Sequence, residues 1–455
     1  MVVGLGRSGI GAAKLLKEEG YPVIVIESGK GIKFQRHAER LIRKGIKVEL
    51  GKPLELQSFK PWINQLKSVV ISPAIPWDHE TLNKLRNLEI NIQGEMTLAW
   101  KRLNHLPWIG ITGTNGKTTV THMLRHIFAE NHIQALMGGN VGNSAAEIAL
   151  DLSTKVEQPE WLIMELSSYQ LETAPNISPR IGIWTNLTPD HLERHGTLKA
   201  YSKIKRKLLE NSQTPIYNAD DPYLSINRDS MKNGLWVSTQ GCGSSKYPSD
   251  FWLDKRGMVI EKGVELFHSS ELKVPGKHNI QNLLLATAAA REAGVTGEKI
   301  KRSINSFSGV PHRLEKLGHI NELSVYNDSK ATNFESAETG LSAVAHPALI
   351  IAGGQVKEGD PTKWIEQLKQ RACAVVLFGS SGNHLKSLVQ LSGFKGEVLY
   401  CKNLDKAVEI ALKIGKEKKA KSLLLSPACA SFDQYQDFEE RGDHFRKIMS
   451  PLLTS

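Results

Sequence analysis

A glycine-rich segment with a single lysine, Gly113–Thr119 (GTNGKTT), has the residue types needed to bind a nucleoside triphosphate. It follows an apolar run at 108–111 that predicts a short buried strand, and it precedes a run at 120–128 that predicts a helix. The backbone N–H groups of such a loop and of the helix N-terminus point at phosphates, and Lys117 adds a positive charge. Thr118 is placed to offer its hydroxyl to Mg²⁺. The segment therefore predicts that the chain binds ATP.

One position departs from the strict Walker A pattern. That pattern requires a glycine at position 111, where this chain has Ile111, so the loop is a variant P-loop. The alternative is a chance Gly-Lys-Thr sequence in a surface turn. The flanking strand and helix argue against that alternative, because a phosphate cradle requires both of them.

Polar residues at the ends of two further predicted strands could complete this site, since the ligands of open α/β sheets gather at the carboxyl ends of strands. Glu165 ends an apolar run at 160–166 and is a candidate ligand for Mg²⁺, which prefers oxygen. The alternative is an ion-paired Glu165 beside a helix-capping serine. His191 follows a strand at 180–186, in the run Asn186–His191, and we expect it to be functional.

Three other polar features have less specific patterns. Lys205 lies four residues after Tyr201 on a predicted helix, and its pattern alone indicates a solvated charge. Two polar runs, at 327–333 and 426–434, lie between predicted buried strands. Residues of these types at this density suit contacts with carboxylates and nucleotides.

The N-terminal residues carry a dinucleotide-binding pattern. Gly-x-Gly-x-x-Gly spans Gly4–Gly9, and the acidic Glu27 follows at about the expected distance. A glycine-rich turn on a helix N-terminus holds any diphosphate, so NAD and UDP fit equally well. Only three residues precede Gly4, so we expect either a clipped strand or a start codon further upstream.

Apolar runs alternate with helical patterns along most of the chain, which predicts an α/β fold with parallel sheets of Rossmann type. Two breaks divide it into three domains at 1–94, 95–308 and 309–455, the first and last Rossmann-like and the central one carrying the P-loop. A polar stretch at about 210–270 predicts a β-rich insertion, and an alanine-rich helix follows at 277–290. Further buried strands are predicted at 1–3, 21–26, 68–71, 324–326, 348–352, 374–378 and 422–426, and a helix at 10–19.

The composition restricts the class of protein. The 455 residues are 40% hydrophobic, which is enough for several cores. No apolar run approaches the roughly 20 residues that cross a bilayer, and we expect no signal peptide before the first glycines. The four cysteines lack metal-like spacing, which predicts free thiols in a reducing cytoplasm. The formal charge of +11 is not gathered in a basic helix or stripe, which favours a polyanionic substrate or a basic proteome over nucleic acid.

Seven motifs together resemble the Mur ligase family in residue type and in order, and the resemblance covers nearly the whole chain. They lie at 113–118, 165–172, 186–191, 276–279, 311–313, 327–333 and 426–431. The last two (NDSKATN and SPACAS) resemble most closely the members that add D-glutamate. The N-terminal region matches least specifically.

This resemblance implies a monomeric, cytoplasmic ligase of peptidoglycan synthesis with three domains. Domain 1–94 would hold the UDP of UDP-N-acetylmuramoyl-L-alanine, domain 95–308 would bind ATP, and domain 309–455 would bind D-glutamate. ATP would phosphorylate the substrate carboxylate, and the amine of D-glutamate would attack the acyl phosphate to give an amide. Phosphorylation turns a poor electrophile into a good one, so the protein's task is positioning and charge neutralisation.

The resemblance also implies roles for individual residues. The catalytic set would be Lys117, Glu165, His191 and Lys205. Two Mg²⁺ ions would be held by Thr118, Glu165, His191 and a carbamylated Lys205, since carbamylation turns the ammonium into an anion. ATP would contact Gly113, Thr114, Asn115, Gly116, Lys117, Thr118, Thr119, Asn279, Asn282, Arg313 and Asp328. The UDP substrate would contact Gly6, Arg7, Ser8, Glu27, Ser28, Ser72, Asn140, Ser167 and His191. D-Glutamate would contact Thr332, Lys357, Ser431 and Phe438. Arg7 replaces a usual apolar residue and Glu27 a usual aspartate.

Three other functions are compatible with single motifs. Another amide ligase of the same family would carry different C-terminal motifs, and one acting on folate would not need the N-terminal diphosphate pattern. An NAD-dependent oxidoreductase would leave the P-loop unexplained. A P-loop ATPase acting as a binding or motor module would need an aspartate ending a neighbouring strand, and Glu165 is the closest candidate.

Overall fold

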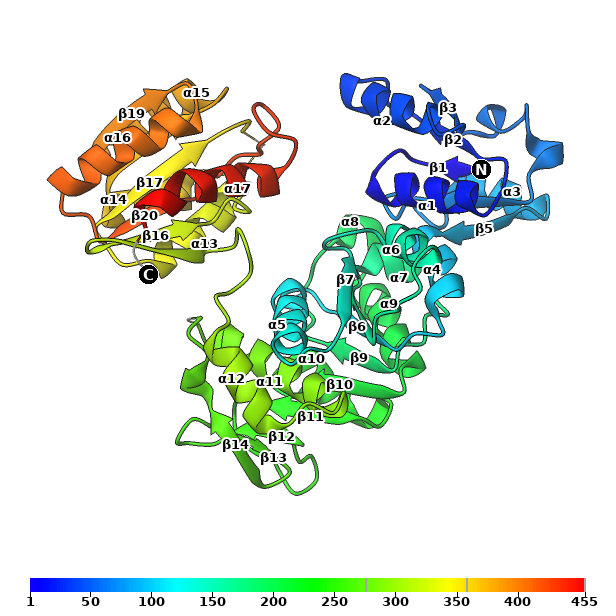
Figure 1. The fold of residues 1–455 in the computed structure, drawn as a ribbon, viewed down its shortest axis with the longest axis horizontal. Helices are drawn as coiled ribbons and strands as arrows, with labels where there is room; N and C mark the ends of the chain where they lie inside the picture. Colours follow the sequence, from blue (N-terminus) through cyan, green and yellow to red (C-terminus); the bar gives the residue numbers. More distant parts are fainter. Residues whose placement is uncertain (275, 357–358, 454–455) are drawn as a thin grey trace. The chain divides into compact units, whose positions relative to one another are not determined.

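The described residues form three β-sheets accompanied by helices, in two compact units, as drawn in Figure 1. The computed structural model describes residues 1–274, 276–356 and 359–453. The first unit, Met1–Phe307, contains two sheets, and the second unit, Ser308–Ser455, contains one. This arrangement confirms the predicted α/β fold, while the division into three domains stays a prediction.

The first sheet is parallel throughout, with the strand order β3-β2-β1-β4-β5. Its central strand has only two residues, both buried. A Cβ on Gly9 would lie 2.0 Å from the carbonyl oxygen of Gly4, so the first helix crosses the strand end closely because Gly9 lacks a side chain. Its elements are β1 (Val2–Val3), α1 (Arg7–Glu18), β2 (Ile24–Glu27), α2 (Ile32–Ile42), β3 (Lys47–Leu50), β4 (Ser68–Ile71), α3 (Glu80–Asn87) and β5 (Asn91–Gly94).

The second sheet has the strand order β14-β13-β12-β11-β10-β9-β6-β8-β7 and is parallel from β7 to β12. The stretch at 210–270 supplies β10 to β14 and so contains the predicted β-rich insertion. Its strands are β6 (Trp108–Thr112), β7 (Ala135–Gly139), β8 (Trp161–Glu165), β9 (Ile181–Trp184), β10 (Thr214–Asn218), β11 (Leu235–Ser238), β12 (Phe251–Leu253), β13 (Met258–Glu261) and β14 (Val264–His268).

The helices that accompany this sheet bury their apolar sides on it. The alanine-rich helix α11 is buried along most of its length and shares a core with α5. The helices are α4 (Glu95–Leu103), α5 (Lys117–Glu130), α6 (Ala145–Ser153), α7 (Ser168–Glu172), α8 (Leu192–His195), α9 (Leu198–Asn211), α10 (Pro222–Ile226), α11 (Lys277–Glu292) and α12 (Gly297–Asn305). Helix α5 begins at Lys117 rather than at the predicted residue 120, because the loop glycine Gly116 takes the N-cap position at φ 83°.

The third sheet forms the second unit, with the order β15-β16-β20-β17-β18-β19, and only its edge pair β15–β16 is antiparallel. Separate buried clusters cover its two faces. Its elements are β15 (Glu315–Ile320), β16 (Leu323–Asn327), α13 (Phe334–Ala343), β17 (Ala348–Gly353), α14 (Thr362–Arg371), β18 (Ala372–Phe378), α15 (Gly382–Leu391), β19 (Glu397–Cys401), α16 (Leu404–Glu417), β20 (Ser422–Leu425) and α17 (Phe438–Met449). Single 3₁₀ turns occur at Leu56–Ser58, Ile63–Gln65, Arg228–Ser230, Ser269–Glu271 and Ser450–Leu452.

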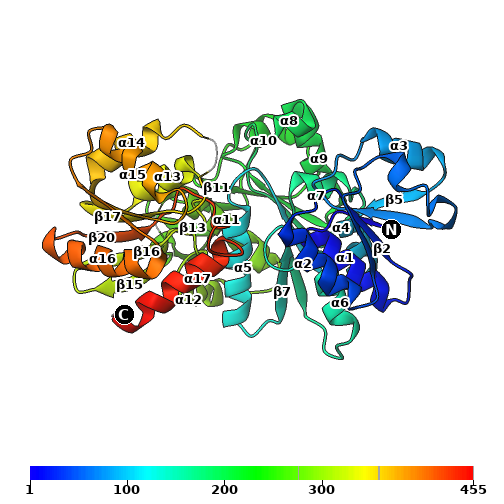
Figure 2. The ribbon, with the colours of Figure 1, turned by 90° about the horizontal axis from the view of Figure 1, so that it is seen from above.

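The order of the second sheet determines where a ligand site can form. Strands β9, β6, β8 and β7 are consecutive neighbours and parallel, so their carboxyl ends meet at one edge. Helix α1 of the first sheet packs against α6, which follows β7, and Figures 1 and 2 show the two helices side by side. Among the described residues, no helix combines the length and the apolar character needed to span a membrane.

Candidate active site

The loop after β6 has the conformation of a phosphate-binding loop. Its two glycines have positive φ angles, 147° at Gly113 and 83° at Gly116, and a Cβ on Gly113 would lie 1.9 Å from Oγ1 of Thr185. The loop is held by the segment after β9. The backbone N–H of Asn115 donates to Oδ1 of Asn186 at 2.8 Å, and Thr185 donates to the carbonyl of Asn115 at 2.6 Å. The predicted P-loop geometry is therefore present, with α5 beginning directly behind it.

Two lysines share one carbonyl oxygen in this loop. Nζ of Lys117 lies 2.9 Å from the carbonyl oxygen of Gly113, and Nζ of Lys205 lies 2.8 Å from the same atom. Lys117 also donates to the carbonyl of Thr114 at 2.8 Å. Two ammonium groups this close would repel each other, and either an anion beside the loop or the loss of a proton from one lysine would relieve the repulsion.

Lys205 is buried, which corrects the interpretation, drawn from its pattern alone, that it is a solvated charge. Its side chain is 1% exposed, whereas Lys203 and Lys207 on the same helix α9 are exposed. Burial, and then the charge of Lys117, lower the pKa of Lys205 well below its ordinary value. Among the described residues, no carboxylate oxygen lies within ion-pairing distance of it. The ring of Tyr201, four residues earlier, lies 4.4 Å from its Nζ.

Glu165 ends β8 with one oxygen held and the other without a partner. Glu165 is buried, with 2% of its surface exposed. Oε1 accepts a hydrogen bond from Nδ2 of Asn140 at 2.8 Å, while Oε2 is buried and has no hydrogen-bond partner in the described structure. Ser167 caps α7, as one alternative anticipated, but the ion pair that this alternative required at Glu165 is absent from the described residues. A buried carboxylate oxygen without a partner is costly, and a bound cation would compensate for it.

The oxygen donors near the P-loop fit Mg²⁺. Oε2 of Glu165 is available, and Thr118 lies in the first turn of α5, where a P-loop hydroxyl reaches the ion. Among the described residues, no three His, Cys, Asp or Glu side chains form a metal cluster. Mg²⁺ needs none, because it is usually held by one or two carboxylates together with phosphate and water.

His191 lies on the other side of the P-loop, after β9. It occupies the N-cap of α8 at φ 51°, a left-handed backbone conformation. Its Nδ1 is 3.3 Å from the hydroxyl of Tyr169, and its Nε2 is 3.5 Å from a carboxylate oxygen of Asp190. These contacts hold the ring at the edge of the sheet to which Glu165 also belongs.

The start of α11 reaches the back of the P-loop. A Cβ on Gly116 would lie 2.5 Å from Oδ1 of Asn282, and Nδ2 of Asn282 lies 3.5 Å from Oδ1 of Asn279. Both asparagines are buried. The structure therefore brings these two predicted ATP contacts to the loop.

The glycine pattern of the first sheet forms a cradle beside Glu27. Its two carboxylate oxygens accept the backbone N–H groups of Leu5 and Gly29, at 2.7 and 2.8 Å, and the hydroxyl of Ser28 donates to it at 3.2 Å. Ser72 lies close by, since a Cβ on Gly4 would be 2.9 Å from the Cβ of Ser72. Gly6 caps α1, which places Arg7 and Ser8 in its first turn. Six of the predicted UDP contacts thus lie at this cradle, and Nη2 of Arg7 donates to the carbonyl oxygen of a seventh, Asn140, at 3.0 Å.

The second unit carries its own polar cluster at strand ends. Asp328 follows β16 and is buried; its two oxygens accept from the backbone of Leu314 at 3.0 Å and from the hydroxyl of Ser426 at 2.9 Å. Burial raises the pKa of Asp328 to about 7, against the lowering effect of these hydrogen bonds. The predicted contact Arg313 is exposed and lies next to Leu314.

Sequence reasoning did not select Arg441, the most deeply buried cation among the described residues of the second unit. Its guanidinium donates to Oγ and the carbonyl of Ser329, at 2.9 and 2.8 Å, and to the carbonyl of Cys429 at 3.1 Å. It joins the loops after β16 and β20, and burial lowers its pKa to about 10. The only feature of the sequence that could have indicated Arg441 is its position, one helical turn after the predicted contact Phe438. Ser431 is buried in the same loop as Cys429, and the carbonyl of Phe438 accepts from Ser329 at 2.8 Å.

The remaining predicted D-glutamate contacts have less structural support. Thr332 is half-buried in the loop before α13. Lys357 lies outside the described residues.

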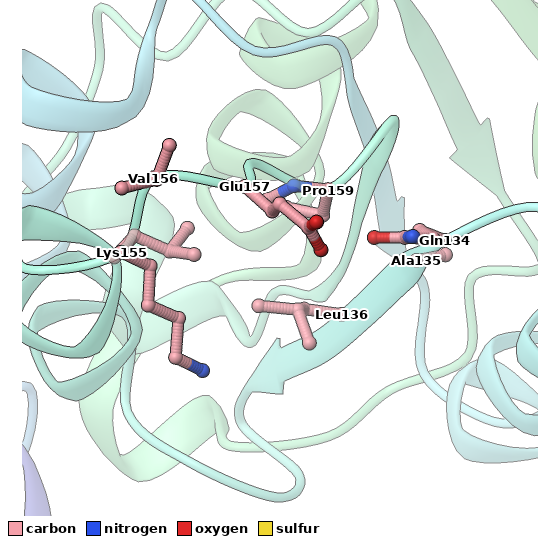
Figure 3. Close-up of a pocket in the computed structure, with 8 residues that line it drawn as sticks. Gln134, Ala135, Leu136, Lys155, Val156, Glu157 and Pro159 are labelled. Carbon is pink, nitrogen blue, oxygen red and sulfur yellow. The ribbon is translucent and has the colours of Figure 1, made fainter.

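A shallow cavity of about 620 Å³, shown in Figure 3, lies elsewhere on the second sheet. It is lined by Leu136, Leu152, Val156 and Pro159, together with the exposed residues Lys155 and Glu157. Gln134 and Ala135 mark the amino end of β7, which is the edge opposite to the P-loop. We therefore do not assign the chemistry to this cavity.

Comparisons with known proteins find the family that the sequence motifs resemble. The family model of the Mur ligase middle domain matches residues 111–290. A Prochlorococcus marinus (strain MIT 9313) protein named UDP-N-acetylmuramoylalanine–D-glutamate ligase is 58% identical, covering 100% of this chain and 99% of the relative. A protein of the same name from Synechococcus sp. (strain CC9605) is 53% identical, covering 100% of this chain and 98% of the relative.

Solved structures support the fold. The UDP-N-acetylmuramate–alanine ligase MurC of Thermotoga maritima has a TM-score of 0.59 at 19% identity, covering 99% of this chain and 98% of that one. MurF of Acinetobacter baumannii has a TM-score of 0.54 at 17% identity, covering 86% of this chain and 85% of that one.

Proposed function

The chain belongs to the Mur ligase family, and from this premise we propose that it joins D-glutamate to UDP-N-acetylmuramoyl-L-alanine at the expense of ATP, in peptidoglycan synthesis. The proposal is supported by full-length relatives of that name. It is supported further by the C-terminal runs at 327–333 and 426–431, which resemble the members that add D-glutamate.

One observation carries the proposal. Lys117 and Lys205 converge on the carbonyl of Gly113, while Glu165 keeps a buried oxygen without a partner on the neighbouring strand. Cations and a free carboxylate oxygen at one strand edge suit a triphosphate together with a divalent ion. An oxidoreductase that used only the Gly4–Gly9 cradle would not require the two lysines at Gly113 or the buried oxygen of Glu165.

The chemistry follows from the charges at this edge. Loop N–H groups and Lys117 hold the phosphates, which lowers the repulsion between ATP and the carboxylate that attacks its γ-phosphorus. That attack forms an acyl phosphate and releases ADP. The neutral amine of D-glutamate then attacks the acyl carbon, phosphate leaves, and the amine proton is lost. Mg²⁺, held by Thr118 and Glu165 and in a second position by His191, would neutralise phosphate charge when bound.

Lys205 suits the carbamylation that we propose for it. Its lowered pKa favours the neutral amine, and only a neutral amine attacks CO₂. The attack forms an N–C bond and loses a proton, which leaves a carbamate anion in place of an ammonium. The carbamate anion would attract the ammonium of Lys117 and supply a further oxygen ligand.

We propose that the enzyme works as a monomer in the cytoplasm. All four cysteines are free, which fits a reducing compartment. The remaining substrate contacts are proposed as the resemblance assigns them: Asn140 and Ser167 to the muramoyl-alanine part, Thr332, Lys357, Ser431 and Phe438 to D-glutamate, and Arg313 and Asp328 to ATP.

A phosphate-release assay across a panel of amino acids tests the proposal. Release is expected only when UDP-N-acetylmuramoyl-L-alanine and D-glutamate are both present. Equal turnover with L-glutamate, L-alanine or meso-diaminopimelate would refute the assignment. Oxygen-18 in the acceptor carboxylate is expected to appear in the released phosphate, and its absence would exclude the acyl phosphate.

A further inference from the structure

A short loop between β7 and α6, residues 140–144, holds the carboxylate of Glu165. We call it the Asn140 loop. The backbone N–H of Asn140 donates to the carbonyl of Glu165 at 2.8 Å, and its side-chain Nδ2 donates to Oε1 at 2.8 Å. These two bonds fix the rotamer of Glu165 and leave Oε2 as the oxygen available to a cation. The position of Asn140 therefore determines where Oε2 points.

The loop cannot move independently of Glu165. Gly139, immediately before it, has φ 96°, and a Cβ there would lie 2.4 Å from the carbonyl oxygen of Glu165. The loop also folds back on its own strand, since the N–H of Gly139 donates to the carbonyl of Asn143 at 2.9 Å. A displacement of the loop is thus passed to the end of β8.

Helix α1, which opens at the diphosphate cradle, touches the same loop at two points. The Nη2 atom of Arg7 donates to the carbonyl oxygen of Asn140 at 3.0 Å. Further along α1, a Cβ on Gly11 would lie 2.4 Å from Oγ of Ser144, so helix and loop are in direct contact. The cradle and the cation site are therefore connected through a few contiguous atoms of the first unit.

The far end of the loop is anchored as well. Oε1 of Glu95, the first residue of α4, accepts the backbone N–H of Ala146 at 2.6 Å. Helix α4 follows β5 of the first sheet directly. Because this end of the loop is fixed, the contact that can change is the exposed hydrogen bond from Arg7 to the carbonyl of Asn140.

The guanidinium of Arg7 has donors left for a phosphate. It carries five N–H groups, and within the described structure one of them is used on Asn140. Arg7 lies in the first turn of α1, where the helix N-terminus attracts a diphosphate. A phosphate oxygen bound there would hold Arg7 between two acceptors, with bonds that charge strengthens.

We propose that Arg7 is a positioning residue that couples the diphosphate cradle to the divalent-cation site at Glu165. The coupling rests on the proposed function, because it requires a diphosphate in the cradle and a cation at Glu165. A bound diphosphate immobilises Arg7, Arg7 fixes Asn140, and Asn140 fixes Oε2. Linkage makes the effect reciprocal, so a diphosphate and a cation raise each other's affinity by the same factor.

The test is a Mn²⁺ titration followed by electron paramagnetic resonance, with ADP saturating the P-loop, in the presence and absence of UDP. In the wild-type protein, UDP is expected to lower the half-saturating Mn²⁺ concentration about fivefold. Arg7→Ala and Arg7→Lys are expected to reduce that shift below about twofold, because neither retains the fork of donors. Arg40→Ala is the matched control, an exposed cation on α2, and it is expected to keep the full shift.

The outcomes separate the coupling from the function on which it rests. UDP binding, measured by calorimetry, without any shift in Mn²⁺ affinity would overturn the coupling alone. A full shift in Arg7→Ala or Arg7→Lys would also overturn it. Failure of UDP to bind would overturn both the coupling and the proposed diphosphate site. The UDP-containing samples of every variant hold the same concentration of UDP, so chelation of Mn²⁺ by free UDP enters each shift equally and cancels when the shifts of the variants are compared.

Discussion

Lys205 shows how one side chain acquires chemistry from its surroundings. Its four-carbon stem would normally carry an ammonium into solvent, but helix α9 places it between Tyr201 and the P-loop. Removing it from water lowers its pKa, and Lys117 lowers it further. The sequence held a signal for this burial, because Lys205 follows Tyr201 by four residues and precedes Leu208 by three, which places it on the buried side of α9. The interpretation as a solvated charge came from the residue type, since lysine is rarely buried without a partner.

We predict that Lys205→Ala abolishes ligation and that short-chain carboxylates partly restore it. The substitution removes the proposed carbamate, and a diffusing carboxylate can place an oxygen in the vacated space. The measurement is kcat for phosphate release with and without added acetate or propionate. Lys203→Ala, on the exposed side of α9, is the control and should retain full activity. Unimpaired turnover of Lys205→Ala without any addition would show that the lysine is structural only.

Glu95 leads to a prediction about the pH dependence of stability. It is fully buried, and burial raises its pKa to about 7, despite a hydrogen bond from Ala146. A raised carboxyl pKa means that the folded protein binds the proton more tightly than the unfolded chain. Its contribution to stability is therefore complete below the unfolded pKa, near 4.5, and is lost as the pH rises through about 7.

Glu95→Gln should remove this dependence. The free energy of unfolding of the variant minus that of the wild type should rise by up to roughly 3 kcal/mol between pH 5 and pH 8. Urea unfolding at several pH values measures the difference, in which the contribution of Asp328 cancels. Exposed Glu157→Gln is the control. A difference that does not vary with pH would contradict the assignment of a neutral acid at Glu95.

At the scale of elements, the site is built where strands end, and this part was predictable. Glycine and polar residues directly after apolar runs identified the ends of β6, β8 and β9 from the sequence. The strand order was not predictable, because the pairing of β6 with both β8 and β9 depends on contacts distant in sequence. For the same reason β7 and its Asn140 loop gave no sign that they hold Glu165.

Gly139 tests how closely β7 and β8 must approach. Gly139→Ala places a methyl group 2.4 Å from the carbonyl oxygen of Glu165 and forces a non-glycine residue to φ 96°. We expect it to cost roughly 3 kcal/mol of stability and to impair the cation site. Gly263→Ala is the matched control, with φ 94° and open space around its Cβ, and should cost only about 1 kcal/mol. Chemical unfolding of both variants gives the comparison, and equal losses would show that backbone strain alone explains Gly139.

At the scale of the whole molecule, each unit closes its own core. The buried clusters of the first unit end at Phe307, and those of the second begin after it. The predicted chemistry is divided accordingly, with the P-loop, Glu165 and Lys205 in one unit and Asp328 and Ser431 in the other. The sequence indicated this division through its motifs, whereas Arg441 became visible only through the loops that it joins.

Separate cores predict that the two units fold as separate fragments. A fragment of residues 308–455 should unfold cooperatively and give dispersed amide resonances, because its two buried clusters and its sheet are complete. The fragment 1–307 should bind ADP and UDP but release no phosphate in response to D-glutamate, since the proposed contacts of that substrate are all in the other fragment.

The control is 1–230, which removes α11 and β11 to β14 from the core behind the P-loop and should not fold. Calorimetry and heteronuclear NMR spectra decide between these outcomes. An unfolded 308–455 fragment would mean that the second unit depends on the first for its stability, and a 1–307 fragment that still ligates D-glutamate would remove the second unit from the reaction.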